Sequence, residues 1–247
     1  MTADRHDDEI ELKRRVAASA VRNRTRGGLS EEVAAYIRQL ILTGVLLPGE
    51  RIDQEAISAD LDVSRSPIRE AVVMLGKEGL VDVRPRRGAA VADLTPDDII
   101  DHYELFGLVA GRAAAMAAKN LAPEQLLALR EIHDQFASSS HSDTSPAVYS
   151  ELNERFHAII NSVAPRRTKW LLGHLVRSVP SNYYEFAEGW DQRSVDHHAR
   201  ILAAIESGDA NEARTAMEHH LHESGIAAAE ALRGQGFWSS QDRDDRK

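Results

Sequence analysis

Four polar side chains in the second half of the sequence have the types and spacing of metal ligands. Asn153 and His157 are four residues apart in the run ELNERFHAII, so they share one face of a helix. His198 and His220 are each in phase with apolar residues of their own helices, which places both on buried stripes. Three imidazoles and an amide oxygen from three helices can converge on one divalent ion and leave positions open for water or ligand. Zinc is the first expectation, with nickel or manganese as alternatives.

The same histidines have a simpler interpretation. A single histidine on an apolar stripe is more typical of a buried side chain that is hydrogen-bonded to backbone or water. The neighbouring His197, His219 and His222 also leave open which histidine of each helix faces inward. Spacing alone therefore leaves both a metal site and an ordinary helical core as interpretations.

A second group of side chains suits recognition of nucleic acid. Arg65 and Ser66 lie at the start of an expected helix and Arg69 lies one turn later, so all three project from the same end. The guanidinium fork can bind O6 and N7 of guanine with two hydrogen bonds, and each such pair discriminates between bases by about 1–3 kcal/mol. We expect these residues to approach base edges in the major groove.

The elements around these arginines predict a winged helix-turn-helix. Three short helices are expected, after Ser30 as N-cap, after Asp53, and after Ser64 or Ser66. Residues 80–94 then change to a strand period interrupted by the run RPRRG, which predicts a β-hairpin with a basic tip. In such a domain the third helix enters the major groove and the hairpin follows phosphates or the minor groove. The residues at the tip are Arg84, Arg86, Arg87 and Gly88.

The rest of the chain predicts an all-helical domain. From Thr95 to about Leu232 the pattern is helical, and about six helices are expected between breaks near 120–123, 138–146, 164–165, 189 and 208. The fold class is therefore mainly α. We expect a flexible arm over residues 1–28, a DNA-binding domain over 29–94, a helical domain over 95–233 and a flexible tail over 234–247.

Composition limits the remaining function classes. The 247 residues include no cysteine, which excludes disulfides, thiolate zinc sites and cysteine nucleophiles. The net charge of −9 is uneven: residues 1–94 hold 15 basic and 16 acidic side chains, whereas residues 95–247 hold 15 and 23. A near-neutral first half permits a basic surface on one face. Apolar runs are short and no signal sequence is visible, so we expect a cytoplasmic protein with no membrane contact.

The run PGERIDQEAISADLDVSRSPIREAVVMLGKEGLVDVRPRRGAAV resembles the DNA-binding domain of the GntR family, over about residues 29–94. The pieces VSRSPIREA, EGLV and RRG carry the resemblance. The resemblance implies a double-stranded operator DNA with two half-sites. It also implies that the operator is contacted at the positions that match Arg65, Ser66, Arg69, Arg87 and Gly88. One position departs from the fatty-acid-responsive branch of the family, which carries an arginine where this chain has Glu55.

Residues from about 95 to 232 resemble the FCD ligand-binding domain of the FadR subfamily, through NERFHAII and HARILAAIESGDANEARTAMEHHL. Many such domains hold a divalent metal with an aspartate and three histidines beneath a carboxylate-bearing effector. Those positions fall on Asn153, His157, His198 and His220. Asparagine is a weaker ligand than aspartate. Phe106 stands where an arginine is common, which favours a more apolar effector such as an acyl compound over a small dicarboxylate.

Together these features predict a homodimeric, ligand-responsive transcription regulator, a repressor, with no enzymatic activity. Effector binding in the helical domain would alter operator affinity. A metal-dependent hydrolase is the alternative from another class, with Glu154 as a base beside a metal-bound water. A DNA-binding protein without an effector is the third. No Ser/His/Asp pattern or phosphate-binding glycine loop is present in the sequence.

Overall fold

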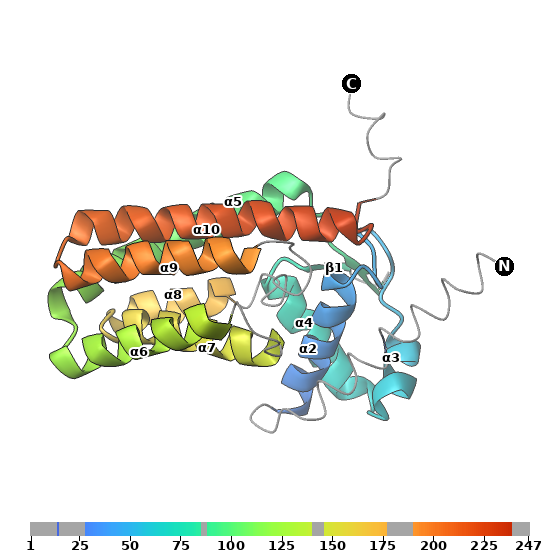
Figure 1. Ribbon diagram of the computed structural model, residues 1–247. Helices are drawn as coiled ribbons and strands as arrows, with labels where there is room; N and C mark the ends of the chain where they lie inside the picture. Colours follow the sequence, from blue (N-terminus) through green and yellow to red (C-terminus); the bar gives the residue numbers. More distant parts are fainter. Residues whose placement is uncertain (1–13, 15–27, 85–87, 140–145, 177–189, 239–247) are drawn as a thin grey trace. The chain divides into compact units, whose positions relative to one another are not determined.

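The computed structural model describes residue 14 and residues 28–84, 88–139, 146–176 and 190–238. The chain divides into two compact units, unit 1 with residues 1–95 and 232–247 and unit 2 with residues 96–231. Helices predominate in both (Figure 1), and the expected fold class, a winged helix-turn-helix followed by an all-helical domain, is confirmed.

Unit 1 is built on three helices that share a core. Helices α2 (Leu29–Leu42) and α3 (Gln54–Leu61) both pack against α4 (Arg65–Lys77). The apolar period of each helix accounts for the faces that meet, since residues three and four apart lie on one side. The side chains at this centre are at most 3% exposed, and they are Val33, Tyr36, Ile37, Leu40, Ile41, Ile57, Ile68, Ala71, Val72 and Leu75.

The helix starts show one correction. Asp53 caps α3 as expected, accepting hydrogen bonds from the N–H groups of Glu55 at 2.8 Å and Ala56 at 3.1 Å. Ser30, expected as an N-cap, instead lies inside α2, which begins one residue earlier after Gly28. Its hydroxyl donates to the carboxylate of Glu70 on α4. Because a partner on another helix satisfies this hydroxyl, the local capping pattern did not determine its role.

The wing follows α4 directly. Strands β1 (Val81–Arg84) and β2 (Gly88–Val91) form an antiparallel pair in which Val81 faces Val91 and Arg84 faces Gly88. The extended segment before α3 joins the free side of β2, because the N–H of Ile52 donates to the carbonyl of Ala89 at 2.9 Å. The turn at 85–87 lies outside the described residues.

The segment after α10 packs within unit 1. We expected residues from 234 onward to be a flexible tail, but the Phe237 side chain is 1% exposed and the Trp238 indole donates to the carbonyl of Leu94 at 2.6 Å. Gly44, with φ +70°, lies against the backbone of this segment at Gln235. Two adjacent aromatic residues in a polar segment were the signal for this packing, since burying them removes a large apolar area from water.

Unit 2 is a bundle of helices whose boundaries follow the breaks in the sequence. Pro96, Pro123 and Pro146 each open a helix, in the first turn where the missing N–H costs no hydrogen bond. The expected break near residue 189 falls in 177–189, outside the described residues. The helices are α5 (Pro96–Asn120), α6 (Pro123–Ser139), α7 (Pro146–Ser162), α8 (Arg166–Leu175), α9 (Trp190–Glu206) and α10 (Ala210–Gly234), the last of which leaves unit 2 after residue 231.

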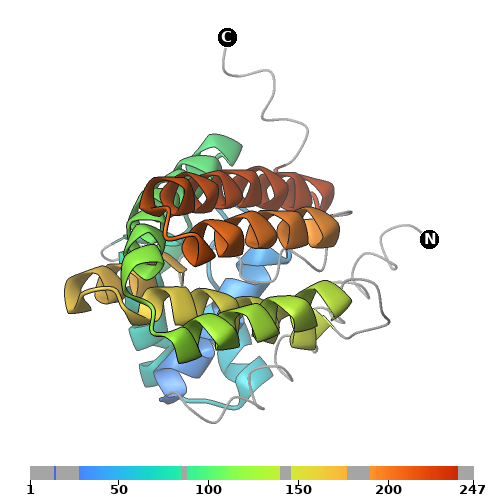
Figure 2. The ribbon, with the colours of Figure 1, turned by 60° about the vertical axis from the view of Figure 1, so that its left-hand side comes forward.

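Two glycines of unit 2 allow close packing between helices. Helix α6 packs on α7 and α9, while α9 and α10 run side by side (Figures 1 and 2). A Cβ added to Gly111 of α5 would lie 2.9 Å from Glu218 of α10, and one added to Gly225 would lie 2.8 Å from Tyr103. The alanines of α5 at 110, 113, 114 and 117 are also buried. Within the described parts of the chain, none of the helices has the length and apolarity needed to span a membrane.

Candidate functional site

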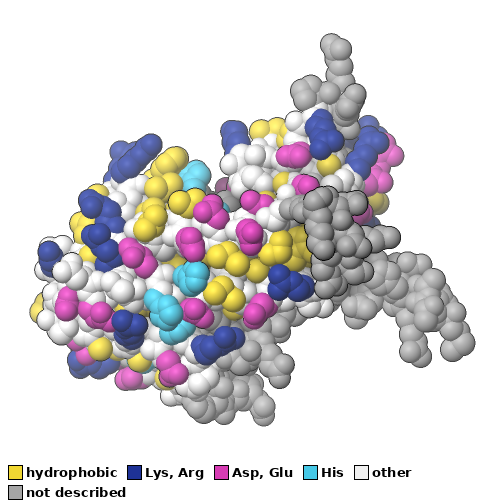
Figure 3. Space-filling model, turned by 90° about the horizontal axis from the view of Figure 1, so that it is seen from above, with side chains coloured by type: hydrophobic (Ala, Val, Ile, Leu, Met, Phe, Trp, Pro, Cys, Tyr) yellow, Lys and Arg dark blue, Asp and Glu magenta, His cyan; other side chains and the backbone are white. Residues whose placement is uncertain are grey.

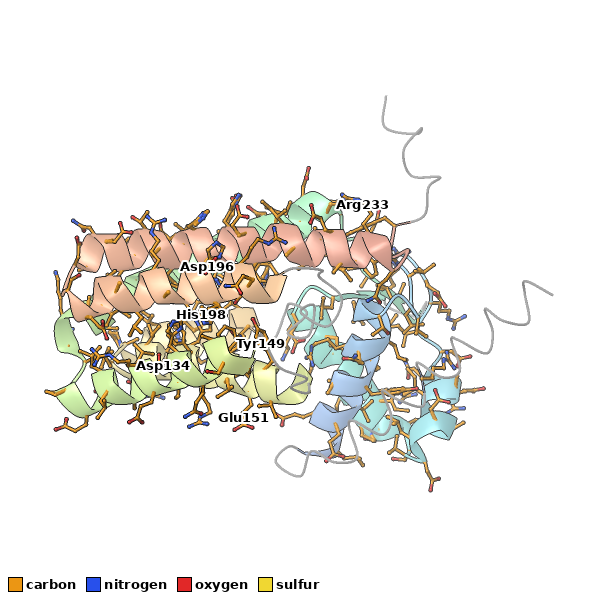
Figure 4. All side chains as sticks on the ribbon, in the orientation of Figure 1. Asp134, Tyr149, Glu151, Asp196, His198 and Arg233 are labelled. Atoms are coloured by element: carbon orange, nitrogen blue, oxygen red, sulfur yellow. The ribbon has the colours of Figure 1, made fainter. Side chains whose placement is uncertain are left out.

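Three of the four expected metal ligands form one cluster inside unit 2. His157 of α7, His198 of α9 and His220 of α10 each offer a ring nitrogen, and these atoms all lie within 4.8 Å of one another. Their ring centroids are separated by 5.1 Å (157 to 198), 5.3 Å (157 to 220) and 4.8 Å (198 to 220). Figure 4 shows His198 directed into the bundle from α9. The spacing therefore placed the correct member of each histidine doublet inward.

The ring-centroid separations are close to those of ligands that share one zinc ion, but the ring nitrogens, which lie within 4.8 Å of one another, must move closer together to bind it. Two imidazoles that bind one tetrahedral ion, each at a metal–nitrogen distance of about 2.0–2.1 Å, have ring centroids about 5 Å apart. All three observed separations lie close to that value. The donor set, three neutral nitrogens, suits zinc and nickel better than calcium or magnesium.

His198 is the most enclosed of the three. Its ring is fully buried and stacks on two aromatic rings. The centroid separation is 4.2 Å to Phe156 and 4.8 Å to Phe136. Neither ring nitrogen has a hydrogen-bond partner among the described residues. A buried polar atom without a partner costs about 1–3 kcal/mol, so an imidazole held in this way needs a compensating ligand. Coordination of one nitrogen to a metal ion would supply that compensation.

The electrostatics of the cluster keep the three rings unprotonated. Burial lowers the pKa of His157 to about 4. Burial, followed by repulsion from the neighbouring histidines, lowers the pKa values of His198 and His220 well below the ordinary value. All three rings are consequently neutral near pH 7, which is the form that binds metal.

Asn153 precedes His157 on α7, and one residue that the sequence analysis missed, His133, lies near the cluster. Asn153 is 7% exposed on α7, one turn before His157. His133 of α6 is half-buried, lies 6.2 Å from the ring of Phe156 and adds to the repulsion that lowers the pKa of His198. Its spacing, four residues after Leu129 and three before Phe136, was a signal that could have found it.

The proposed base of a hydrolase does not belong to this cluster. Glu154 is exposed on α7, whereas its neighbour Asn153 is buried. A general base must reach the water it activates, at about 2.6–3.2 Å or through one further water. The described residues therefore offer a binding centre without the base that the hydrolase interpretation requires.

The expected DNA-contacting residues of α4 are exposed together. Arg65, Ser66 and Arg69 lie in the first five residues of the helix, and all three side chains are exposed. Arg65 forms an ion pair with Glu55 of α3 at 2.6 Å, and both side chains are more than half exposed. The position that departs from the fatty-acid-responsive branch thus contacts the first arginine of the recognition helix.

At the wing, Gly88 is described and Arg87 lies outside the described residues. Gly88 has φ +87°, a conformation that favours glycine. A Cβ there would lie 3.5 Å from the guanidinium of Arg51, a basic residue that the sequence analysis did not select. Arg84 is exposed and 3.6 Å from Asp82. The described base of the wing therefore presents two guanidinium groups beside an exposed glycine.

Comparison with known proteins identifies the two parts of the chain. Residues 29–91 match the family described as bacterial regulatory proteins, gntR family, and residues 101–223 match the FCD domain. An HTH-type transcriptional regulator of Agrobacterium vitis is 32% identical over 136 residues, which cover 53% of this chain and 79% of that protein. The chain belongs to the GntR family.

Other relatives agree with a GntR regulator. An uncharacterized HTH-type transcriptional regulator of Mycobacterium tuberculosis is 40% identical over 112 residues, 45% of this chain and 46% of that protein, so the match spans about half of its length. The HTH-type transcriptional repressor RspR of Escherichia coli is 22% identical over 218 residues, 87% of this chain and 95% of the relative.

Solved structures show the same fold. Escherichia coli McbR/YncC superposes with a TM-score of 0.62 at 20% identity, over 84% of this chain and 99% of that one. The GntR domain implies binding of double-stranded DNA, and the FCD domain implies a site for a small-molecule effector. Both domains indicate a transcription regulator, a class of protein that is generally not an enzyme.

Proposed function

We propose that this chain is a metal-dependent, effector-responsive repressor of the FadR subfamily that acts as a homodimer in the cytoplasm. The observation that carries the proposal is the convergence of three histidines from three helices, whose ring nitrogens lie within 4.8 Å of one another, inside the domain that implies an effector site. The name of the relative RspR supports the repressor role. The proposed limits are 29–94 for the DNA-binding domain and 95–233 for the effector domain, between an arm at 1–28 and a tail at 234–247.

The DNA-binding part of the proposal rests on exposed groups at one helix end and at the wing. Arg65, Ser66 and Arg69 read base edges in the major groove, while Gly88 lets the wing backbone approach the sugar–phosphate backbone beside Arg87. A two-fold dimer would present two recognition helices to two half-sites. The acidic charges of residues 95–247 keep non-specific attraction to DNA low outside this surface.

The effector part rests on the enclosed histidines. His157, His198 and His220, with Asn153 as a weaker fourth ligand, hold a divalent ion, zinc first and nickel or manganese as alternatives. When bound, the ion supplies a positive centre that attracts a carboxylate. Phe106 is half-buried on α5 and adds no charge, so a carboxylate with an acyl or aromatic body is the effector class that we propose. Effector binding would change the spacing of the two DNA-binding domains and hence operator affinity.

A two-stage experiment tests this function. Operator duplexes are first selected from a random pool, and their binding is measured by fluorescence anisotropy at fixed salt. Zinc-loaded protein is then titrated with acyl and aromatic carboxylates and with short hydroxy acids. We expect an acyl or aromatic carboxylate to weaken operator binding and to raise the melting temperature, and neither effect in His198→Ala. If no duplex is selected, the proposed function as a DNA-binding regulator is refuted. If only short hydroxy acids stabilise the protein, the proposed acyl or aromatic carboxylate effector is refuted.

A further inference from the structure

Helices α9 and α10 each carry a histidine doublet, and the two doublets face each other. His198 and His220 point inward and belong to the cluster described above. The other members, His197 and His219, are half-buried and exposed respectively, and their ring centroids are 5.0 Å apart. Two histidine pairs therefore bridge the same two helices, one inside the bundle and one at its surface.

The outer pair has the spacing of two ligands of one ion. Imidazoles that share a tetrahedral ion have ring centroids about 5 Å apart when the metal–nitrogen distance is about 2.0–2.1 Å. The ring centroids of His197 and His219 are 5.0 Å apart, and those of the inner pair, His198 and His220, are 4.8 Å apart. Both separations are close to that value. Arg200 and Glu212 also form an ion pair between α9 and α10, at 2.7 Å.

Carboxylates lie next to the outer pair. Glu223 follows His219 by four residues on α10, so both side chains lie on one face of that helix. Figure 3 shows histidine side chains at the surface with acidic side chains beside them. The Glu223 carboxylate is therefore the candidate oxygen ligand for a third coordination position.

We propose that His197, His219 and Glu223 form a second site for a divalent transition-metal ion, at the surface of the bundle and separate from the inner centre. The remaining positions are filled by water, which makes this site weaker than the enclosed one. The ring centroid of His197 lies 5.7 Å from that of His220, a ligand of the inner centre, so the two sites are adjacent. The proposal does not depend on occupancy of the inner site, because the ligand sets share no residue.

Zinc titration of the full chain tests the second site. Protein without a histidine tag is stripped with a chelator, and zinc chloride binding is measured by isothermal titration calorimetry. We expect two zinc ions per chain with different affinities. His219→Ala and Glu223→Gln should each weaken the weaker site at least about tenfold, in the range that loss of a supporting group at a metal site causes. His174→Ala, a change at an exposed histidine of α8, is the matched control and should leave both sites unchanged.

The outcomes separate the two metal sites. His198→Ala should remove the tighter event and leave the weaker one. If only the weaker event is present in the wild type and His219→Ala removes it, the outer site stands and the inner one fails. If one zinc binds and neither His219→Ala nor Glu223→Gln alters it, the outer site is refuted while the inner site stands.

Discussion

The two units carry their candidate functional residues in opposite ways. In unit 1 they are exposed and close in sequence, with Arg65, Ser66 and Arg69 in the first turns of one helix. In unit 2 they are enclosed and far apart in sequence, since His157, His198 and His220 come from three helices. The first arrangement leaves side chains free to meet a large external partner, whereas the second builds an internal site that the bundle must hold together. Changes at the exposed arginines of unit 1 should therefore alter DNA binding with little effect on stability, whereas changes at the enclosed histidines of unit 2 should also alter stability.

Metal removal should give the largest effect. A ligand that binds only the folded state stabilises it by about 4 kcal/mol when its free concentration is 1,000 times its dissociation constant. We expect chelation to lower the free energy of unfolding by this order in zinc-loaded wild type, as measured by urea denaturation. His198→Ala protein should show no response to the chelator. If the chelator leaves the wild-type unfolding curve unchanged, the histidines of unit 2 do not stabilise the fold through a metal, and the two units no longer differ in this respect.

Loss of a recognition arginine should come next. Arg69→Ala should lower affinity for a selected operator by about 1–3 kcal/mol, because a bidentate contact to guanine is worth that much, and should leave the unfolding curve unchanged. Fluorescence anisotropy at a fixed salt concentration measures the affinity. Arg112→Ala, a change at an exposed arginine of α5, is the matched control. Equal losses in the two variants would mean that general charge, rather than α4, determines binding.

Asn153→Asp should strengthen the inner centre. The substitution replaces a buried neutral amide, one turn before His157, with an anionic oxygen ligand. Changes around metal ligands alter affinity by about 10–100-fold, and we expect a gain of at least about tenfold in zinc affinity, measured by chelator competition. Operator affinity of the metal-free protein should not change. Weaker zinc binding in the variant would show that Asn153 does not face the ion.

Glu55→Gln should have a smaller effect, confined to DNA. The ion pair with Arg65 is exposed, so its loss should change the free energy of unfolding by less than about 1 kcal/mol. Removing a negative charge beside the recognition helix should raise affinity for any duplex severalfold at low salt, and less at high salt because of screening. Anisotropy with non-operator duplex at two salt concentrations measures this. Glu124→Gln, an exposed change on α6, is the control; weaker binding by Glu55→Gln would contradict the account.

The smallest effect concerns pH. Burial lowers the pKa of His102 on α5, against a partly opposing hydrogen bond with the carbonyl of Leu175. The unfolded chain then binds a proton more readily than the folded one, so the stability contributed by neutral His102 is present above about pH 6.5 and is lost as the pH falls below it. In urea denaturation of metal-free protein, His102→Gln should lose less stability between pH 7.5 and 5.5 than wild type. An equal or greater loss would contradict the assigned role.

The sequence predicted the fold and most of the candidate site because both follow from local periodicity. Helix breaks at prolines and the phase of His198 and His220 required no tertiary information. Packing between distant segments was not predictable in that way. The partner of Ser30 on α4 and the burial of Phe237 depend on which surfaces meet. The same holds for the stacking of Phe136 and Phe156 on His198 and for the outer histidine pair, which appear only when the helices α6, α7, α9 and α10 are placed together.

The central claim is that the three enclosed histidines hold a metal ion, and elemental mass spectrometry of tag-free, desalted protein tests it most directly. We expect close to one zinc, nickel or manganese ion per chain in the wild type, and loss of that ion in His198→Ala and in His220→Ala. His174→Ala should retain it. Wild-type protein without a stoichiometric metal after reconstitution with zinc, or a metal that survives both substitutions, would contradict the account.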